Sequence, residues 1–284
     1  MDDGGVARRQ KGGTGMVDYS LYQHLLVEKK EDGVVLVTIS RPEKANAMNA
    51  RLHSELARIW RDLGDDPEVR VAIVTGAGRH FSPGGDLEWV GQTLGDERSV
   101  LHLLREAGEL VYSMVNLDKP VISAINGVAM GAGLAVALCA DISIASERAR
   151  LNDGHVLLGV AAGDHACLIW PLLCGMAKAK HYLLTAKWID AREAERIGLV
   201  SMVVPHEELL TTALGIAGDL ARGPQPAIRL TKRALNQWLR LFGLASFDYS
   251  TAVEMLGFLG QDAQAGLRSL RETKAPPPRF PSAQ

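Results

Sequence analysis

The chain has 284 residues, of which 47% are hydrophobic and 23% charged, a composition typical of a globular protein. Its formal net charge of -2 provides no basic surface, so we expect no nucleic-acid partner. The longest apolar run, residues 127–140, is shorter than the ~20 residues of a membrane span. With no secretory signal apparent, we expect a cytoplasmic protein without membrane contact. Three cysteines without metal-type spacing are expected to be reduced and buried: Cys139, Cys167 and Cys174.

The predicted elements alternate between strands and helices over the first two thirds of the chain. Short β-branched runs predict strands at 34–39, 71–75, 121–125, 141–145 and 199–204. Apolar residues at helical spacing predict helices around 52–63 and 100–114, and a Gly/Ala-rich helix after Asn126-Gly127. A capping box, Asp190 with Glu193, opens a helix at 191–197. This alternation predicts an α/β architecture with largely parallel strands.

From residue 206 onward the pattern is purely helical. Two apolar stripes, 209–220 and 228–242, are separated by Pro224 and Pro226, and Pro276-Pro277-Pro278 is expected to end the ordered chain. We therefore expect a flexible extension at 1–17, an α/β core at 18–205 and a helical subdomain at 206–284. The subdomain could cover a site or join subunits.

Two glycine-rich turns each follow a predicted strand, at 81–87 and 126–133. Glycine lets the backbone approach a ligand closely, and N–H groups at the start of a helix are free to bind negative charge. Two such N–H groups from separate loops could form an oxyanion hole. For an isolated Gly-x-Gly, tight packing is the simpler interpretation, and neither turn has the spacing of a dinucleotide or phosphate loop.

Four segments together resemble the crotonase (enoyl-CoA hydratase/isomerase) superfamily in order and spacing. They are RPEKANAMN at 41–49, FSPGGDL at 81–87, KPVISAINGVAMGAG at 119–133 and DAREAERIGLV at 190–200. The resemblance covers roughly residues 24–280. It implies a crotonase-like spiral of β-β-α turns with a C-terminal helical region that trimerises, so that a homotrimer or homohexamer is expected.

The resemblance also implies the positions of site residues. The backbone N–H groups of Gly85 and Ala132 would hold a thioester carbonyl. The residues near coenzyme A (CoA) would be Lys44, Ala45, Ala47 and Asp86, the last as a loop-fixing residue rather than an acid. CoA would be part of the substrate, and neither a separate cofactor nor a metal ion is expected. Four cations could meet its phosphates or simply lie exposed: Lys44, Arg79, Lys232 and Arg233.

The chain departs from the superfamily at its acid–base residues. Hydratases of this type use two glutamates, which would fall at Ala135 and His155 here. Residues 152–171 instead resemble a carbon–carbon hydrolase of the same superfamily, 6-oxocamphor hydrolase, which cleaves a β-diketone and pairs a histidine with an aspartate nine residues later. His155 and Asp164 have that spacing. In that interpretation His155 activates water, because an imidazole pKa near ~6.5 suits proton acceptance at neutral pH, and Asp164 orients its ring.

Other interpretations of these residues remain open. His155 could be a packed or capping histidine that pairs with Asp153. His165 and Trp170 are expected to be structural, although Trp170 could line an acyl pocket. The carboxylates of two C-terminal helices are expected on solvated faces, namely Glu254 and Asp262.

Three functions are compatible with these patterns. The first is an acyl-CoA enzyme, a lyase or isomerase of the enoyl-CoA hydratase type, in which His155 moves protons. The second is a β-diketone hydrolase that does not need CoA, and the third is a non-catalytic oligomer with the crotonase fold. We favour the first, with an acyl-CoA thioester as substrate, because the motif at 41–49 is intact.

Overall fold

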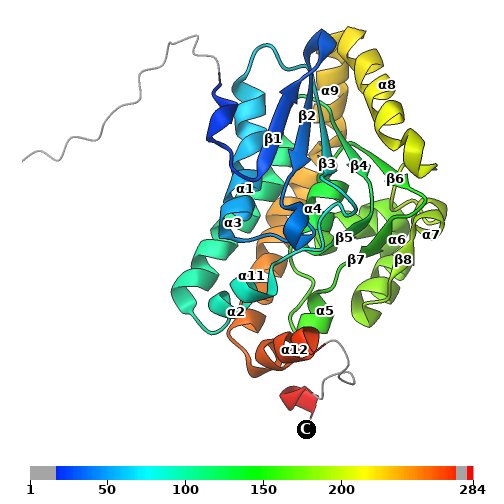
Figure 1. Cartoon of the computed structure of the whole chain (residues 1–284). Helices are drawn as coiled ribbons and strands as arrows, with labels where there is room; N and C mark the ends of the chain where they lie inside the picture. The colour runs from blue at the N-terminus through cyan, green and yellow to red at the C-terminus, as the bar shows by residue number, and fades with distance from the viewer. Residues whose placement is uncertain (1–16, 273–279, 284) are drawn as a thin grey trace, which may run out of the picture.

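The computed structural model describes residues 17–272 and 280–283 (Figure 1). The expectations for residues 1–16 and for Pro276-Pro277-Pro278 lie outside this part of the chain. Among the described residues, we find no helix with the length and apolar character needed to cross a membrane.

A six-stranded sheet organises the core, in the order β1-β2-β3-β4-β6-β9. Its strands are β1 (Leu25–Lys29), β2 (Val34–Ile39), β3 (Val71–Gly76), β4 (Val121–Ile125), β6 (Ile142–Ser146) and β9 (Met202–Val204). Only β1 pairs antiparallel, with β2; every other neighbouring pair is parallel. The prediction of largely parallel pairing is confirmed. The strand predicted at 199–204 proved too long, because Leu199 and Val200 follow the turn that ends a helix.

A second, smaller sheet turns away from the first at the end of two of these strands, β4 and β6. It contains β5 (Val128–Met130), β7 (Arg150–Asn152) and β8 (Ile189–Asp190), none of which was predicted. The chain passes from the large sheet to the small one twice, between residues 125 and 128 and between residues 146 and 150. This repeated strand–corner–strand–helix turn is the expected spiral.

Helices cover both faces of the large sheet (Figure 1). The helices of this part of the chain are α1 (Ala50–Asp65), α2 (Leu87–Thr93), α3 (Glu97–Asn116), α4 (Ala132–Cys139), α5 (His155–Leu158), α6 (His165–Thr185), α7 (Ala191–Arg196) and α8 (Leu209–Arg222). Helices α1, α3 and α4 pack on one face of the sheet and α8 on the other, whereas α2 and α5 lie away from it against α12. Along β2, Val35 and Val37 pack toward α1 and α3, while Val34 and Leu36 pack toward α8. The pleat sends alternate side chains to opposite faces, so a strand buried on both sides is apolar throughout.

The C-terminal region is helical, as expected. It continues with α9 (Gln225–Leu235), α10 (Gln237–Phe242), α11 (Asp248–Phe258) and α12 (Gln261–Arg271). Helix α11 packs on α3, and α12 packs on α2 and α5. A small apolar cluster that includes Leu158, Met255 and Phe258 joins them, so the C-terminal helices close over the segment that begins at His155.

Candidate active site

A cavity of about 540 Å³ lies between the two glycine turns and helix α11. Seven of the eight site residues expected from the sequence line it: Lys44, Ala47, Gly85, Asp86, Ala132, His155 and Asp164. The remaining wall is mainly apolar and includes Trp89, Leu103, Met255, Phe258 and Leu270. The sequence pattern therefore brings residues from distant parts of the chain to one place.

The two glycine turns touch each other at the cavity. Gly84 has φ +86°, and a Cβ atom placed on it would lie 2.9 Å from the Met130 carbonyl oxygen and 3.7 Å from the Cα of Gly131. Only a residue without a side chain permits this approach of two backbones. The turns thus hold Gly85 and Ala132, each next in sequence to one of these glycines, on neighbouring loops.

The backbone N–H groups of Gly85 and Ala132 are available to a ligand. Met48 donates its N–H to the Gly84 carbonyl and accepts from Asp86, which leaves the Gly85 N–H without a partner among the described residues. Ala132 is the first residue of α4, where an N–H has no acceptor within the helix. This arrangement can bind an oxyanion.

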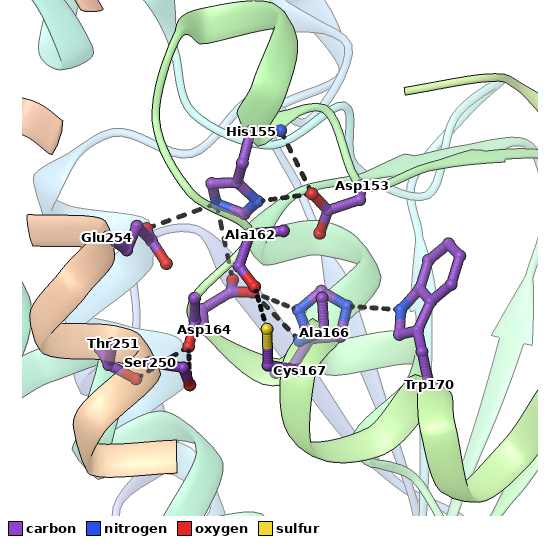
Figure 2. A network of polar contacts seen from close by, with 12 residues as sticks. Asp153, His155, Ala162, Asp164, Ala166, Cys167, Trp170, Ser250, Thr251 and Glu254 are labelled. Carbon is purple, nitrogen blue, oxygen red and sulfur yellow. Dashed lines mark hydrogen bonds and ion pairs between the residues drawn. The ribbon is translucent and has the colours of Figure 1, made fainter. Parts of the chain in front are cut away.

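His155 lies at the centre of a group of carboxylates (Figure 2). It begins α5, directly after Gly154, and its Nδ1 lies 3.0 Å from Oδ2 of Asp153. On the other side of the ring, Nε2 lies 3.4 Å from Oε1 of Glu254 and 3.9 Å from Oδ2 of Asp164. We call Asp153, His155, Asp164 and Glu254 the acid–base cluster.

Glu254 corrects one expectation from the sequence. Its side chain comes from α11 and is buried against His155, not on a solvated face of the helix. Asp262, by contrast, lies away from the cavity, where it accepts hydrogen bonds from Ser282. A carboxylate at 254 in helical line with Thr251 and Phe258 was the available signal.

Asp164 has a nearer partner than His155. It caps α6, and its Oδ1 lies 2.7 Å from Nδ1 of His165, whose Nε2 accepts a hydrogen bond from the Trp170 indole at 3.4 Å. His165 and Trp170 are buried behind the cavity and do not line it. Asp153, two residues before His155 in sequence, makes the shortest contact to the His155 ring.

Burial and charge oppose each other at this cluster. Burial by itself lowers the pKa of His155, but the carboxylates of Asp153, Glu254 and Asp164 outweigh it and hold that pKa well above 6.5. Burial raises the pKa of Glu254, and the histidines at 165 and 155 lower the pKa of Asp164 against its burial. The carboxylates therefore favour the protonated form of His155. In that state it donates a proton or stabilises an anion, and it accepts a proton only after losing its own.

Two carboxylate oxygens of the cluster lack a hydrogen-bond partner among the described residues. They are Oδ1 of Asp153 and Oε2 of Glu254, both buried. Asp153, His155 and Asp164 also offer ligand atoms within 4.8 Å of one another, a spacing that a metal ion could use. The same atoms already pair with one another as imidazole and carboxylate, which accounts for their spacing.

A second histidine–carboxylate pair faces the cavity and was not predicted. His53 of α1 lines the cavity, and its Nδ1 lies 2.9 Å from Oε2 of Glu106 on α3. The ring centroid of Trp89 lies 5.4 Å from that of His53. The only sequence signal was a polar residue in line with the buried Leu56 and Trp60 of α1.

The residues expected near CoA behave differently from one another. Lys44 and Ala47 line the cavity, whereas Ala45 does not and takes a left-handed conformation at the end of a short turn. Asp86 caps α2 and faces Arg41 at 3.6 Å, consistent with a loop-fixing role.

Lys232, expected as a possible phosphate ligand, is buried and bound to Asp141 at 2.7 Å, so it cannot reach a phosphate. Arg233 lies 3.8 Å from Asp118, and Arg79 lies outside the cavity.

Ala135 is buried inside α4 and contributes no polar group. The cysteines are free, but Cys167 is exposed and Cys174 only half-buried, contrary to the expectation of buried thiols.

Known proteins are similar to this chain in fold and in sequence. The family model for enoyl-CoA hydratase/isomerase matches residues 29–278. Crotonyl-CoA hydratase of Syntrophomonas wolfei is 34% identical over 259 residues, which cover 89% of this chain and 96% of that protein. An enoyl-CoA hydratase/isomerase structure from Mycobacterium paratuberculosis is 35% identical with a TM-score of 0.84, covering 88% of this chain and all of that one.

A β-diketone hydrolase from Anabaena is similar as well. Its structure is 27% identical with a TM-score of 0.79, and the match covers 85% of this chain and 96% of that chain. Given the extent of these matches, the chain belongs to the enoyl-CoA hydratase/isomerase family, the crotonase superfamily.

Proposed function

We propose that the protein is an acyl-CoA enzyme that stabilises a thioester enolate with the N–H groups of Gly85 and Ala132. The observation that carries this proposal is the convergence of these two free N–H groups with the acid–base cluster on one cavity. Hydrogen bonds preorganised toward developing negative charge are commonly the largest catalytic contribution in such sites. Lys44 and Ala47, on the same cavity, would contact the CoA portion.

The cluster supplies both halves of a proton-transfer cycle. In hydration, a carboxylate accepts a proton from water while the water oxygen bonds to the β-carbon. The enolate formed in this step then takes a proton at the α-carbon. Glu254, whose pKa burial raises, is the better proton acceptor near neutral pH, and protonated His155 is the donor. Asp153 and Asp164 would hold the imidazolium in place.

A second candidate is hydrolysis of a β-diketone. It is favoured by the absence of both hydratase glutamates, by the His155–Asp164 spacing, and by similarity to the β-diketone hydrolase from Anabaena. Water would add to one carbonyl, the carbon–carbon bond would break to an enolate, and that enolate would take a proton at carbon. The two N–H groups would bind the oxyanion in both steps.

The deciding experiment follows the loss of enoyl absorbance from crotonyl-CoA, and separately the loss of a cyclic 1,3-diketone. Wild type is compared with His155→Ala and with His181→Ala, which removes an exposed histidine from α6. Loss of crotonyl-CoA turnover only in His155→Ala supports the first function. Turnover of the diketone alone supports the second, and turnover of neither substrate supports a non-catalytic protein.

We also propose that the protein assembles as a homotrimer or a dimer of trimers. Large apolar side chains on the C-terminal helices are exposed in the single chain, among them Leu235 at 64%, Trp238 at 62% and Leu256 at 68%. Clustered exposed apolar side chains typically mark an interface. Light scattering of the full chain would test this, and a monomeric mass would contradict it.

A further inference from the structure

A second hollow, of about 400 Å³, lies away from the catalytic cavity at the carboxyl ends of the parallel strands. Four strands that are neighbours in the sheet, β3, β4, β6 and β9, each send their following loop to it. In open parallel sheets, ligands bind beyond the carboxyl ends of the strands. Its walls are Arg79, His80, Asn126, Gly127, Val128, Arg148, Arg150 and His206, and we call it the arginine pocket.

The arginine pocket has an unusual charge for this chain. The whole sequence has 33 acidic and 31 basic residues, yet the pocket is lined by three arginines and two histidines and by no acidic residue. None of its guanidinium groups forms an ion pair within the described part of the chain. Like charges gathered in a concave site repel one another, and a bound anion relieves that repulsion.

The nearest acidic residue by strand register is already engaged. Asp190 pairs with Arg150 across the β7–β8 ladder, but its carboxylate accepts the Glu193 N–H at 2.8 Å as the cap of α7. The Arg150 guanidinium instead lies over the Trp188 ring, 5.9 Å from its centroid. Stacking of this kind restricts an arginine while leaving its N–H groups available.

The two histidines add directed polar groups. Ser146 Oγ accepts the Arg148 N–H at 3.1 Å and lies 2.9 Å from Nδ1 of His206, so its hydroxyl proton can serve that nitrogen and leave Nε2–H as a donor. Nδ1 of His80 is buried and has no hydrogen-bond partner among the described residues. A buried polar atom without a partner is rare, and this nitrogen is available to a bound ligand.

We propose that the arginine pocket binds the phosphate groups of a small phosphorylated ligand. Guanidinium groups bind phosphate oxygens in pairs, and three of them exceed what one carboxylate can use. The volume falls in the lower part of the range of ~300–1,000 Å³ for small-molecule sites. A diphosphate group therefore fits both the charge and the space.

The ligand's phosphates can come from two sources. One is a separate phosphorylated metabolite; the other is the nucleotide end of an acyl-CoA substrate, an assignment that rests on the proposed function. The loop at 41–47 connects the two sites: Lys44 and Ala47 line the cavity, while Asn46 Nδ2 donates to the carbonyls of Ala77 and His80 at 2.8 and 2.7 Å. The pocket and the cavity thus share one supporting loop.

Calorimetric titration of the full chain with inorganic pyrophosphate at low ionic strength tests the pocket. Wild type should bind, and Arg148→Gln/Arg150→Gln should bind at least about tenfold more weakly, since each charged hydrogen bond contributes ~1.5–3 kcal/mol. Arg98→Gln, which removes one exposed charge from α3, is the control. Absence of binding by wild type, or equal affinity of the double variant and the control, would overturn the proposal.

Competition identifies the source of the phosphates. If CoA displaces pyrophosphate and the double variant raises KM for an acyl-CoA without lowering kcat, the pocket binds the substrate's nucleotide end. If CoA does not compete, the pocket binds a separate phosphorylated ligand. Pyrophosphate binding is measured without turnover. The titration therefore tests the pocket even if the proposed acyl-CoA activity is not found.

Discussion

Replacing His155 by glutamine removes the only cation from the acid–base cluster. The imidazole Nδ1 and Nε2 lie 3.0–3.9 Å from three carboxylates, which otherwise face one another in a buried site. Glutamine keeps a polar side chain of similar size but carries no charge. We expect His155→Gln to destabilise the folded protein, because three carboxylates then lose their shared counter-charge.

The size of the expected fall in stability follows from the burial of the ion pairs that His155 makes. Removing one partner of a buried ion pair costs about 3–5 kcal/mol. With an unfolding entropy of ~2.1 cal/mol/K per residue, the 284 residues give about 0.6 kcal/mol/K, so the expected fall in Tm is roughly 5–8 °C. Glu254→Gln should lower Tm less, because burial already raises the pKa of that carboxyl and disfavours its charge.

Thermal unfolding between about pH 5.5 and 9 measures the effect and its sign. The folded-state pKa of His155 is raised above 6.5, so the stabilisation it provides is fully present below pH 6.5. It is lost as the pH rises through the folded-state pKa, and the gap in Tm between wild type and His155→Gln should then narrow. His181→Gln, an exposed histidine on α6, is the control.

The reasoning is refuted if His155→Gln and wild type have the same Tm at the acidic end of this range. It is also refuted if the Tm gap widens as the pH rises, because that would mean that the neutral imidazole is the stabilising form. A gap that is constant with pH would assign the loss to packing rather than to charge.

Three further predictions follow from the geometry. Gly84→Ala should cost about 1–2 kcal/mol for its left-handed backbone, and it should also lower activity because the added Cβ separates the two glycine turns. In Gly95→Ala, where φ is +78° and the added Cβ meets only the Gln264 side chain at an ordinary 3.7 Å, denaturation and activity assays should show only the backbone cost. Glu106→Gln should destabilise by about 3 kcal/mol in urea, because it breaks a buried pair with His53; an effect below 1 kcal/mol would show that the pair is not ionic. Asp190→Ala should cost about 1 kcal/mol by removing the cap of α7, and an unchanged urea midpoint would contradict that role.

Much of the fold could be predicted because local patterns were unambiguous. The strand at 34–39 has the predicted bounds, and the Asp190 capping box opens α7. Helix α6 was missed because Pro171 lies inside it and Gly175 interrupts it with φ +75°, which hides the helical period. Strands β5, β7 and β8 have two or three residues each, too few to show alternation.

The candidate site was predictable only where sequence neighbours carry the geometry. The glycine turns and His155 were found because their motifs are contiguous, and they line one cavity. Glu254 and His53 reach that cavity from α11 and α1, more than 90 residues away from His155 in either direction, and no local pattern encodes that distance. Tertiary packing alone decides whether a polar residue on an amphipathic helix faces solvent or a site.

At position 155 this chain has a histidine where hydratases of the family have a glutamate, and the charge on that histidine matters for the site. A glutamate at 155 would add a negative charge to Asp153, Asp164 and Glu254, whereas the histidine offsets them. Under the proposed function, the two free N–H groups would stabilise an enolate, and a cationic proton shuttle would stand where hydratases of this family have an acidic one. Intermediates that carry more negative charge than a thioester enolate would gain most from a neighbouring imidazolium. The comparison of crotonyl-CoA with a cyclic diketone therefore tests the electrostatics of the site as well as its substrate.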